Sequence, residues 1–174
     1  RMGQSSNRCA LVVHADDVDA SRTPLFWKLE HAVWADATSV TGFLSPLHEL
    51  VLSGDVDADA AATATHRYVD SQHNAMQAVA QREAKFSGVY VSSDTLVGEE
   101  VAKDVVVVRH CRPVPAEALV QRQGDADLRP ALASFAQHEQ LQELLGIDGW
   151  STPYDEDTRY LDALDAFAQS LSSQ

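Results

Sequence analysis

The stretch Asp104–Cys111 constrains the fold more than any other part of the sequence. It reads Asp-Val-Val-Val-Val-Arg-His-Cys, and four consecutive β-branched residues are typical of a strand that is buried on both faces. Two further apolar runs, residues 10–13 and 88–91, also have the composition of strands. The sequence therefore predicts a small three-stranded sheet with residues 104–111 as its central strand.

Helical periodicity dominates the remaining long segments. A Thr-Pro and a Ser-Pro start signal predict helices over residues 23–36 and 45–53, and the absence of Pro and Gly predicts one long Ala-rich helix over 55–86. Further helices are predicted over 130–145 and 156–171. The predicted fold class is α/β, with α+β as the alternative, and it is helix-dominant, with several helices covering the sheet.

Length and composition favour one folded domain. A chain of 174 residues fits a single globular domain, predicted over residues 9–174, with residues 1–8 as a flexible or partner-docked tail and the amphipathic segment 156–171 as a C-terminal docking helix. A net charge of −13 disfavours nucleic acid as a partner. No apolar run approaches the roughly 20 residues of a membrane span, so membrane insertion is not expected.

Two cysteines, Cys9 and Cys111, adjoin predicted buried strands. Two reduced core thiols are favoured over a disulfide framework, and this points to an intracellular location in the cytoplasm or the mitochondrial matrix. The first fifteen residues contain Arg1 and Arg8 but no acidic residue, as a trimmed organellar presequence would leave them. A tag remnant or a fragment explains this asymmetry equally well.

Polar clusters follow the predicted strands. His14, Asp16 and Asp17 follow the first strand, and Arg109 and His110 end the Val-rich strand. If the strands were parallel, these side chains would meet at one edge of the sheet, where carboxylates could hold Mg²⁺, the arginine could bind phosphate and a histidine could move a proton. The more ordinary interpretation, which we favour, is that strands leave a core through polar loops.

A weaker metal candidate lies on the predicted long helix. His66, Asp70 and His73 follow the spacing i, i+4, i+7 and would share one helix face. That face lies opposite the apolar stripe, where an ordinary solvated face belongs. We therefore predict no bound metal and no cofactor.

Apolar helix faces suggest protein–protein contacts, and no stretch identifies a known family. The predicted interface residues are Trp27, Trp34, Tyr160, Leu164, Phe167 and Leu171. Because no catalytic motif is present, the sequence favours a non-catalytic accessory or structural subunit of a larger intracellular multiprotein assembly, bound to other protein subunits through its helices. The alternative is a small metal- or phosphate-handling α/β enzyme with its site at the strand ends.

Overall fold

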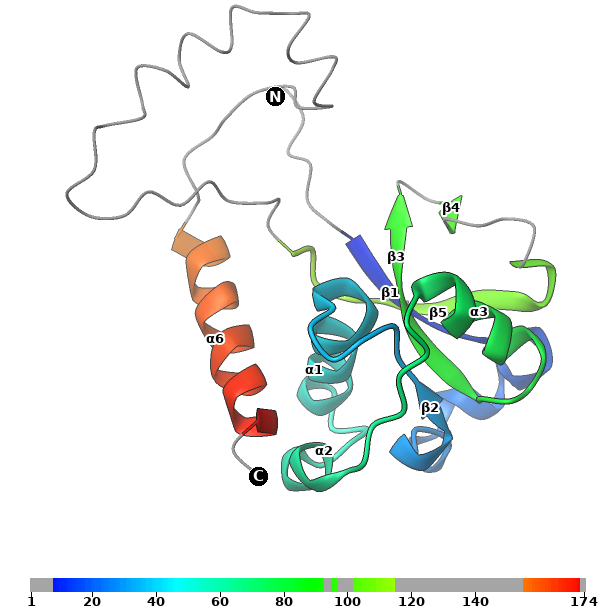
Figure 1. The fold of residues 1–174 in the computed structure, drawn as a ribbon, viewed down its shortest axis with the longest axis horizontal. Helices are drawn as coiled ribbons and strands as arrows, with labels where there is room; N and C mark the ends of the chain where they lie inside the picture. The colour runs from blue at the N-terminus through cyan, green and yellow to red at the C-terminus, as the bar shows by residue number, and fades with distance from the viewer. Residues whose placement is uncertain (1–7, 93–94, 97–101, 115–154, 173–174) are drawn as a thin grey trace, which may run out of the picture.

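The computed structural model describes residues 8–92, 95–96, 102–114 and 155–172, which form a mixed α/β fold (Figure 1). One sheet has the strand order β2-β3-β1-β5, and β4 pairs with β3. β1 is antiparallel to both β3 and β5, whereas β2 is parallel to β3. The strands are β1 (Arg8–His14), β2 (Ala32–Val33), β3 (Phe86–Ser92), β4 (Thr95–Leu96) and β5 (Val105–His110).

The Val-rich strand is not the central one, so that part of the prediction is wrong. β1 has strand neighbours on both sides, and its residues from Cys9 to Val13 are completely buried. β5 ends the sheet, and Val106 and Val108 are only partly buried there. A strand with one neighbour leaves an edge open, so a run of β-branched residues alone does not fix a central position.

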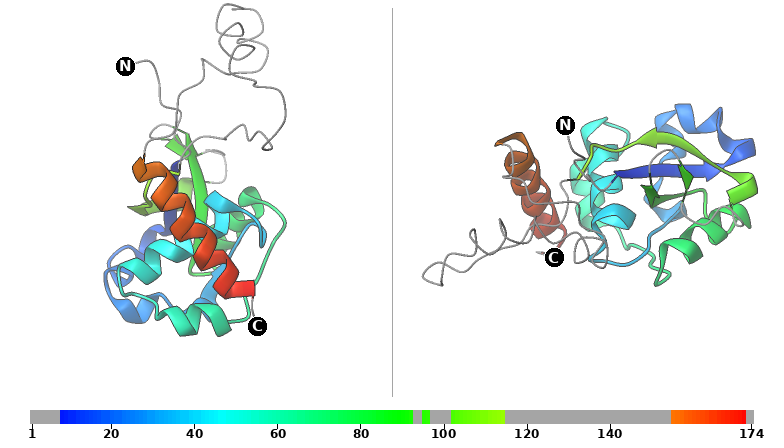
Figure 2. Two further views of the ribbon diagram at one scale, coloured as in Figure 1. Left: turned by 90° about the vertical axis from the view of Figure 1, so that its left-hand side faces the viewer. Right: turned by 90° about the horizontal axis from the view of Figure 1, so that it is seen from above.

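Side chains of the sheet alternate between two apolar clusters. Leu11 and Val13 point into a cluster with α1 (Ser45–Leu52), whereas Ala10 and Val12 point toward α3 (Gln72–Ala80). The C-terminal helix α6 (Asp155–Ser172) lies beside α1 on the side away from α3 (Figures 1 and 2). The core is therefore layered, with helices on both faces of the sheet.

The predicted helix over 45–53 is confirmed as α1, but the helix over 23–36 is wrong. That segment contains the 3₁₀ turns Pro24–Phe26 and Leu29–His31, followed by β2; two further 3₁₀ turns, Ala15–Asp17 and Ala20–Arg22, precede it. Phe26 and Trp27 are buried against Phe86 of β3. Burial of these aromatic side chains takes precedence over the local helix signal.

One long helix over 55–86 does not form either. α2 (Ala58–Thr63) and α3 are separated by an extended segment in which Tyr68 forms a parallel bridge with Trp34. Trp34 donates its backbone N–H to the carbonyl of Arg67 at 2.9 Å and accepts that of Val69 at 3.0 Å. Backbone pairing of Trp34, just beyond β2, with this segment thus takes the place of helical hydrogen bonds. The prediction of a helix-dominant fold with a three-stranded sheet is therefore imprecise.

Some predicted features lie outside the described residues, among them the helix over 130–145 and residues 1–7 of the tail. The single-domain prediction for residues 9–174 stays a prediction. A short 3₁₀ turn, Ala102–Asp104, precedes β5. Among the described helices, none combines the length and the hydropathy needed to cross a bilayer.

Candidate functional site

The segment 36–42, here called the hydroxyl loop, joins β2 to the helical segment that contains α1. Asp36 Oδ1 accepts the backbone N–H and the hydroxyl of Thr38 at 2.8 and 2.7 Å. Ser39 Oγ accepts the N–H of Gly42 at 3.0 Å and caps the π-helical turn Val40–Leu44 that runs into α1. Two short polar side chains therefore fix the backbone of the loop at a helix start.

Gly42 packs too tightly for a side chain. A Cβ atom at Gly42 would stand 2.7 Å from Cβ of Ala35 and 2.8 Å from Oγ of Ser39. Any other residue would push the loop away from the strand segment that precedes it.

Gln72 links the hydroxyl loop to the sheet and to a second helix start. Its Nε2 donates to Thr41 Oγ1 at 3.1 Å, and its Oε1 accepts the backbone N–H of Tyr90 in β3. Gln72 is the first residue of α3, which Ser71 caps by accepting the N–H of Asn74 at 3.1 Å. Two helices therefore begin side by side at one place.

This arrangement suits a small anion. The first N–H groups of a helix have no intrahelical partner, and the helix dipole places partial positive charge there. Thr38 donates its hydroxyl to Asp36, whereas the hydroxyl oxygens of Ser39 and Thr41 accept hydrogen bonds. Ser39 and Thr41 are half-buried, so their hydroxyl hydrogens lie near the surface as further donors. The sequence does contain a signal for this site, a run of hydroxyl residues and Gly between a strand and a Ser-Pro helix start, but the strand-end analysis missed it.

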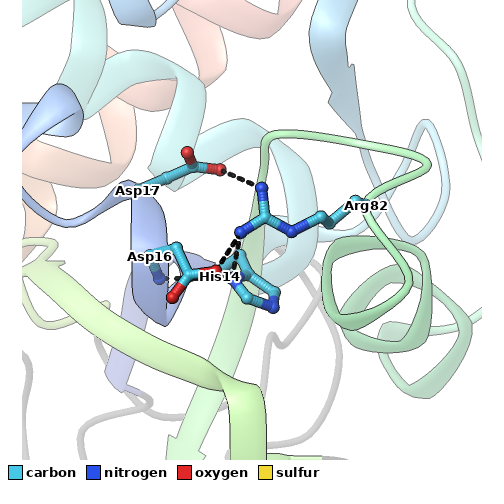
Figure 3. Close-up of polar contacts among 4 residues, drawn as sticks. All are labelled: His14, Asp16, Asp17 and Arg82. Carbon is cyan, nitrogen blue, oxygen red and sulfur yellow. Dashed lines mark hydrogen bonds and ion pairs between the residues drawn. The ribbon is translucent and has the colours of Figure 1, made fainter.

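The predicted strand-end residues His14, Asp16 and Asp17 do meet, at Arg82 (Figure 3). Arg82 Nη2 lies 3.0 Å from His14 Nδ1 and contacts the Asp16 carboxylate, and its Nη1 lies 3.9 Å from Asp17 Oδ2. Arg82 is about half exposed and Asp16 is 74% exposed. Exposed ion pairs of this kind are common on protein surfaces.

Arg109 and His110 are not part of that cluster. β5 runs antiparallel to β1, so His14 lies opposite Val105, whereas His110 lies opposite Ala10. The parallel arrangement that would gather all five residues at one edge is therefore wrong. His110 is exposed at the other end of the strand pair.

Arg109 has structural partners of its own. Its Nη2 lies 2.7 Å from Asp55 Oδ2, its Nη1 donates to Ser53 Oγ at 2.7 Å, and its guanidinium lies 5.5 Å from the Trp27 ring. These contacts tie β5 to the loop that follows α1.

The weak metal candidate His66, Asp70 and His73 does not share a helix face, because the long helix does not form. His66 Nε2 contacts the carbonyl of Ala61 at 3.0 Å, and burial lowers the pKa of His66. Asp70 precedes α3 with φ of 64°, and His73 is exposed on α3. Within the described part of the chain, no group of three or more His, Cys, Asp or Glu is placed to hold a metal ion.

The candidate interface tryptophans lie inside the molecule. Trp34 is completely buried and Trp27 is 3% exposed, both against Phe86. The helix on which they were to share an apolar face is absent, and both side chains fill the core instead.

The candidate interface residues of α6 pack on their own chain. Leu164 is 4% exposed, and the Phe167 ring lies 5.0 Å from that of His48 in α1. Tyr160 Oη lies 2.8 Å from Ser45 Oγ, and Leu171 packs against the cluster under α1. A pocket of about 370 Å³ lies between the two helices and is lined by His48, Leu52, Arg112, Arg159, Tyr160 and Ala163.

Comparisons with known proteins find one matching family model and solved structures of similar fold. The family described as "ABC transporter, phosphonate, periplasmic substrate-binding protein" matches residues 1–163. XAC2383 from Xanthomonas citri, solved bound to ATP, has a TM-score of 0.71 and 22% identity over 99% of this chain and 69% of that chain.

A second solved structure is the binding protein component of an ABC phosphonate transporter from Pseudomonas aeruginosa. It has a TM-score of 0.58 and 19% identity over 94% of this chain, which spans 58% of that one. At these identities the two structures show a solute-binding-protein-like fold. No curated protein matches the chain.

The family match overturns the predicted function, location and partners. An accessory subunit of an intracellular assembly is wrong, because the matching family is of periplasmic substrate-binding proteins. Cytoplasmic and mitochondrial locations are wrong as well, because the family is periplasmic. The predicted partners, other protein subunits of such an assembly, are wrong too, because proteins of the matching family bind a transport substrate.

Proposed function

The chain belongs to the family of periplasmic substrate-binding proteins of ABC phosphonate transporters, and we propose that it binds a phosphonate group at the hydroxyl loop. The observation that supports this site most directly is the meeting of two helix starts, held together by the hydrogen bond from Gln72 to Thr41. A phosphonate presents three oxygen acceptors with negative charge, which match backbone N–H groups and hydroxyl donors.

The acidic composition strengthens the case for a local site. With a net charge of −13, the protein repels anions at long range. An anionic substrate must therefore be held by short-range donors, and the hydroxyl loop supplies the hydroxyls of Ser39 and Thr41. Asp36 is the one carboxylate in the loop. Asp36 already accepts two hydrogen bonds from Thr38.

The biological role proposed is delivery of the bound substrate to the membrane permease of an ABC transporter. The chain spans 69% and 58% of the lengths of the two solved structures. The hydroxyl loop is the part of the proposed substrate site that lies in this chain. The carbon substituent of the phosphonate is left open by these contacts, since they address only the anionic group.

Isothermal titration calorimetry tests the site. We expect methylphosphonate and 2-aminoethylphosphonate to bind, and Thr41→Val and Ser39→Ala to weaken binding about 10-fold or more, the cost of losing a charge-assisted hydrogen bond. Arg112→Ser, on the pocket between α1 and α6, is the matched control and should bind as the parent does. Unchanged binding in both loop variants, with binding lost in Arg112→Ser, would move the site to the pocket.

Nucleotides are a necessary comparison, because the Xanthomonas citri structure contains ATP. Adenosine triphosphate and orthophosphate offer the same oxygen acceptors and belong in the same titrations. Binding of either phosphonate in preference to both supports the proposal. Tight binding of ATP with no measurable phosphonate binding contradicts it.

A further inference from the structure

Cys9 and Cys111 lie directly opposite one another. The pairing of Ala10 with His110 continues to this pair, and Cys111 donates its backbone N–H to the carbonyl of Cys9 at 2.9 Å. Opposite residues in a hydrogen-bonded antiparallel pair have Cα atoms about 5.5 Å apart, which is within the range that disulfides span. Both side chains therefore leave the backbone where a disulfide can close without moving the strands.

Both thiols share one buried cluster. Cys9 is completely buried, Cys111 is 7% exposed, and they pack with Val114 and Tyr160. A hydrogen bond from the Cys111 thiol lowers the pKa of Cys9, while the same contact raises the pKa of Cys111. Cys9 Sγ also lies 3.2 Å from Ser45 Oγ, which in turn contacts Tyr160 Oη. The two thiols therefore lie in the same buried cluster, at the ends of two paired strands.

We propose that Cys9 and Cys111 form a disulfide in the exported protein. Two reduced thiols were expected because each cysteine adjoins a buried strand, and an intracellular location was inferred from them, whereas the family is periplasmic. Disulfides form and persist in the bacterial periplasm. In the structure both cysteines are free thiols. The proposal rests on the compartment of the family and on strand pairing, and it does not depend on where a phosphonate binds.

The oxidant is a disulfide, either that of a periplasmic dithiol oxidant or that of oxidised glutathione. Cys9 loses its proton to solvent and, as a thiolate, attacks one sulfur of the oxidant, which releases one thiolate and leaves a mixed disulfide. Cys111, deprotonated in turn, attacks Sγ of Cys9 and releases the second thiolate. Two thiols are oxidised and one disulfide is reduced. Because both side chains are buried, this exchange precedes closure of α6 over them.

The bond would join the start of β1 to the chain that leaves β5. It closes a loop of about 100 residues, and in the chain-entropy model a cross-link removes more conformational entropy from the unfolded chain the longer the loop it closes. We therefore expect the oxidised protein to melt about 10 °C above the reduced protein.

Thiol counting tests the proposal directly. The full chain is exported to the periplasm of a bacterial host, purified without reductant, denatured and treated with a maleimide. The expected result is no maleimide adduct and an intact mass lower by two hydrogen atoms, with both cysteines labelled after reduction. The proposal would be overturned if two samples both gave two labelled cysteines: the exported protein, and protein refolded from denaturant in oxidised glutathione.

Cysteine variants identify the two sulfur atoms that form the bond. Cys9→Ser and Cys111→Ser should each leave one labelled thiol, and Cys9→Ala/Cys111→Ala should melt near the reduced parent and with the same circular dichroism. A disulfide-linked dimer on a non-reducing gel, or loss of cooperative melting on oxidation, would contradict a native intramolecular bond. None of these measurements uses a ligand, so failure of phosphonate binding and failure of the disulfide are separate results.

Discussion

Gly88 of β3 lies directly under Pro46 of α1. A Cβ atom at Gly88 would stand 2.4 Å from Cγ and 2.6 Å from Cβ of Pro46, and 3.3 Å from the carbonyl oxygen of Gly42. The contact brings the first turn of α1 onto the backbone of the sheet. Since the hydroxyl loop leads into this turn, the glycine in β3 also sets the position of the loop.

Gly88→Ala should therefore destabilise the protein. Overpacking at a backbone contact costs about 1–3 kcal/mol of the free energy of unfolding, and urea denaturation followed by circular dichroism measures it. Gly54→Ala is the matched control, because Gly54 has φ of 75° and no atom within 4 Å of its virtual Cβ. That variant should lose only the backbone strain of about 1 kcal/mol. Equal losses in the two variants would show that Gly88 is not in tight contact.

Gln72→Ala should weaken phosphonate binding more than it lowers stability. It removes the hydrogen bond to Thr41 and leaves the Tyr90 N–H without the Gln72 carbonyl, so the hydroxyl loop is no longer tied to β3. We expect calorimetry to give roughly 10-fold weaker binding of methylphosphonate. Gln77→Ala, at an exposed position of the same helix, should bind as the parent does. Unchanged affinity in Gln72→Ala would mean that the link does not position the loop.

Local signals predicted the fold where nothing distant opposed them. The Ser-Pro start of α1 agrees with its burial, so the helix forms at the expected residues. The long helix fails because Trp34, distant in sequence, pairs with residues on either side of Tyr68. The hydrophobic periodicity of residues 55–86 cannot predict that the segment pairs with a residue so distant in the sequence.

The prediction of sites failed where it needed the relative direction of the strands and the cellular compartment of the protein. The apolar runs identified β1, β3 and β5, but a run does not say whether its neighbour is parallel, and antiparallel pairing separates His14 from His110. The cysteines were placed beside strands correctly, whereas the intracellular location inferred from their expected reduced state is contradicted by the family. Both errors concern information that a single segment does not contain.

Acid should destabilise the protein through His66. Burial lowers the pKa of His66 from its ordinary value of 6.5, and its ring packs against Trp34 and Phe43. A histidine with a depressed folded-state pKa adds stability above its unfolded pKa, and this stability is lost as pH falls through the folded-state pKa.

We therefore expect His66→Phe to lose less free energy of unfolding than the parent between about pH 7.5 and about pH 5.5. Urea denaturation at both values measures the difference. His73→Phe, at an exposed position of α3, should keep the acid sensitivity of the parent. Identical pH dependence in His66→Phe and the parent would exclude His66 as a source of that sensitivity.

Substitution by Asp should destabilise the protein strongly at one leucine of α6 and little at another. Leu164 is 4% exposed and Leu161 is 37% exposed, although only three positions separate them on one helix. Leu164→Asp places a charge at a buried position of α6, and we expect a cost of about 3 kcal/mol or more, or a melting temperature lower by about 10 °C. Leu161→Asp should change the melting temperature by no more than a few degrees. The measurement is the melting temperature of each variant. If both Leu164→Asp and Leu161→Asp melt near the parent, α6 does not stabilise the fold by packing on its own chain.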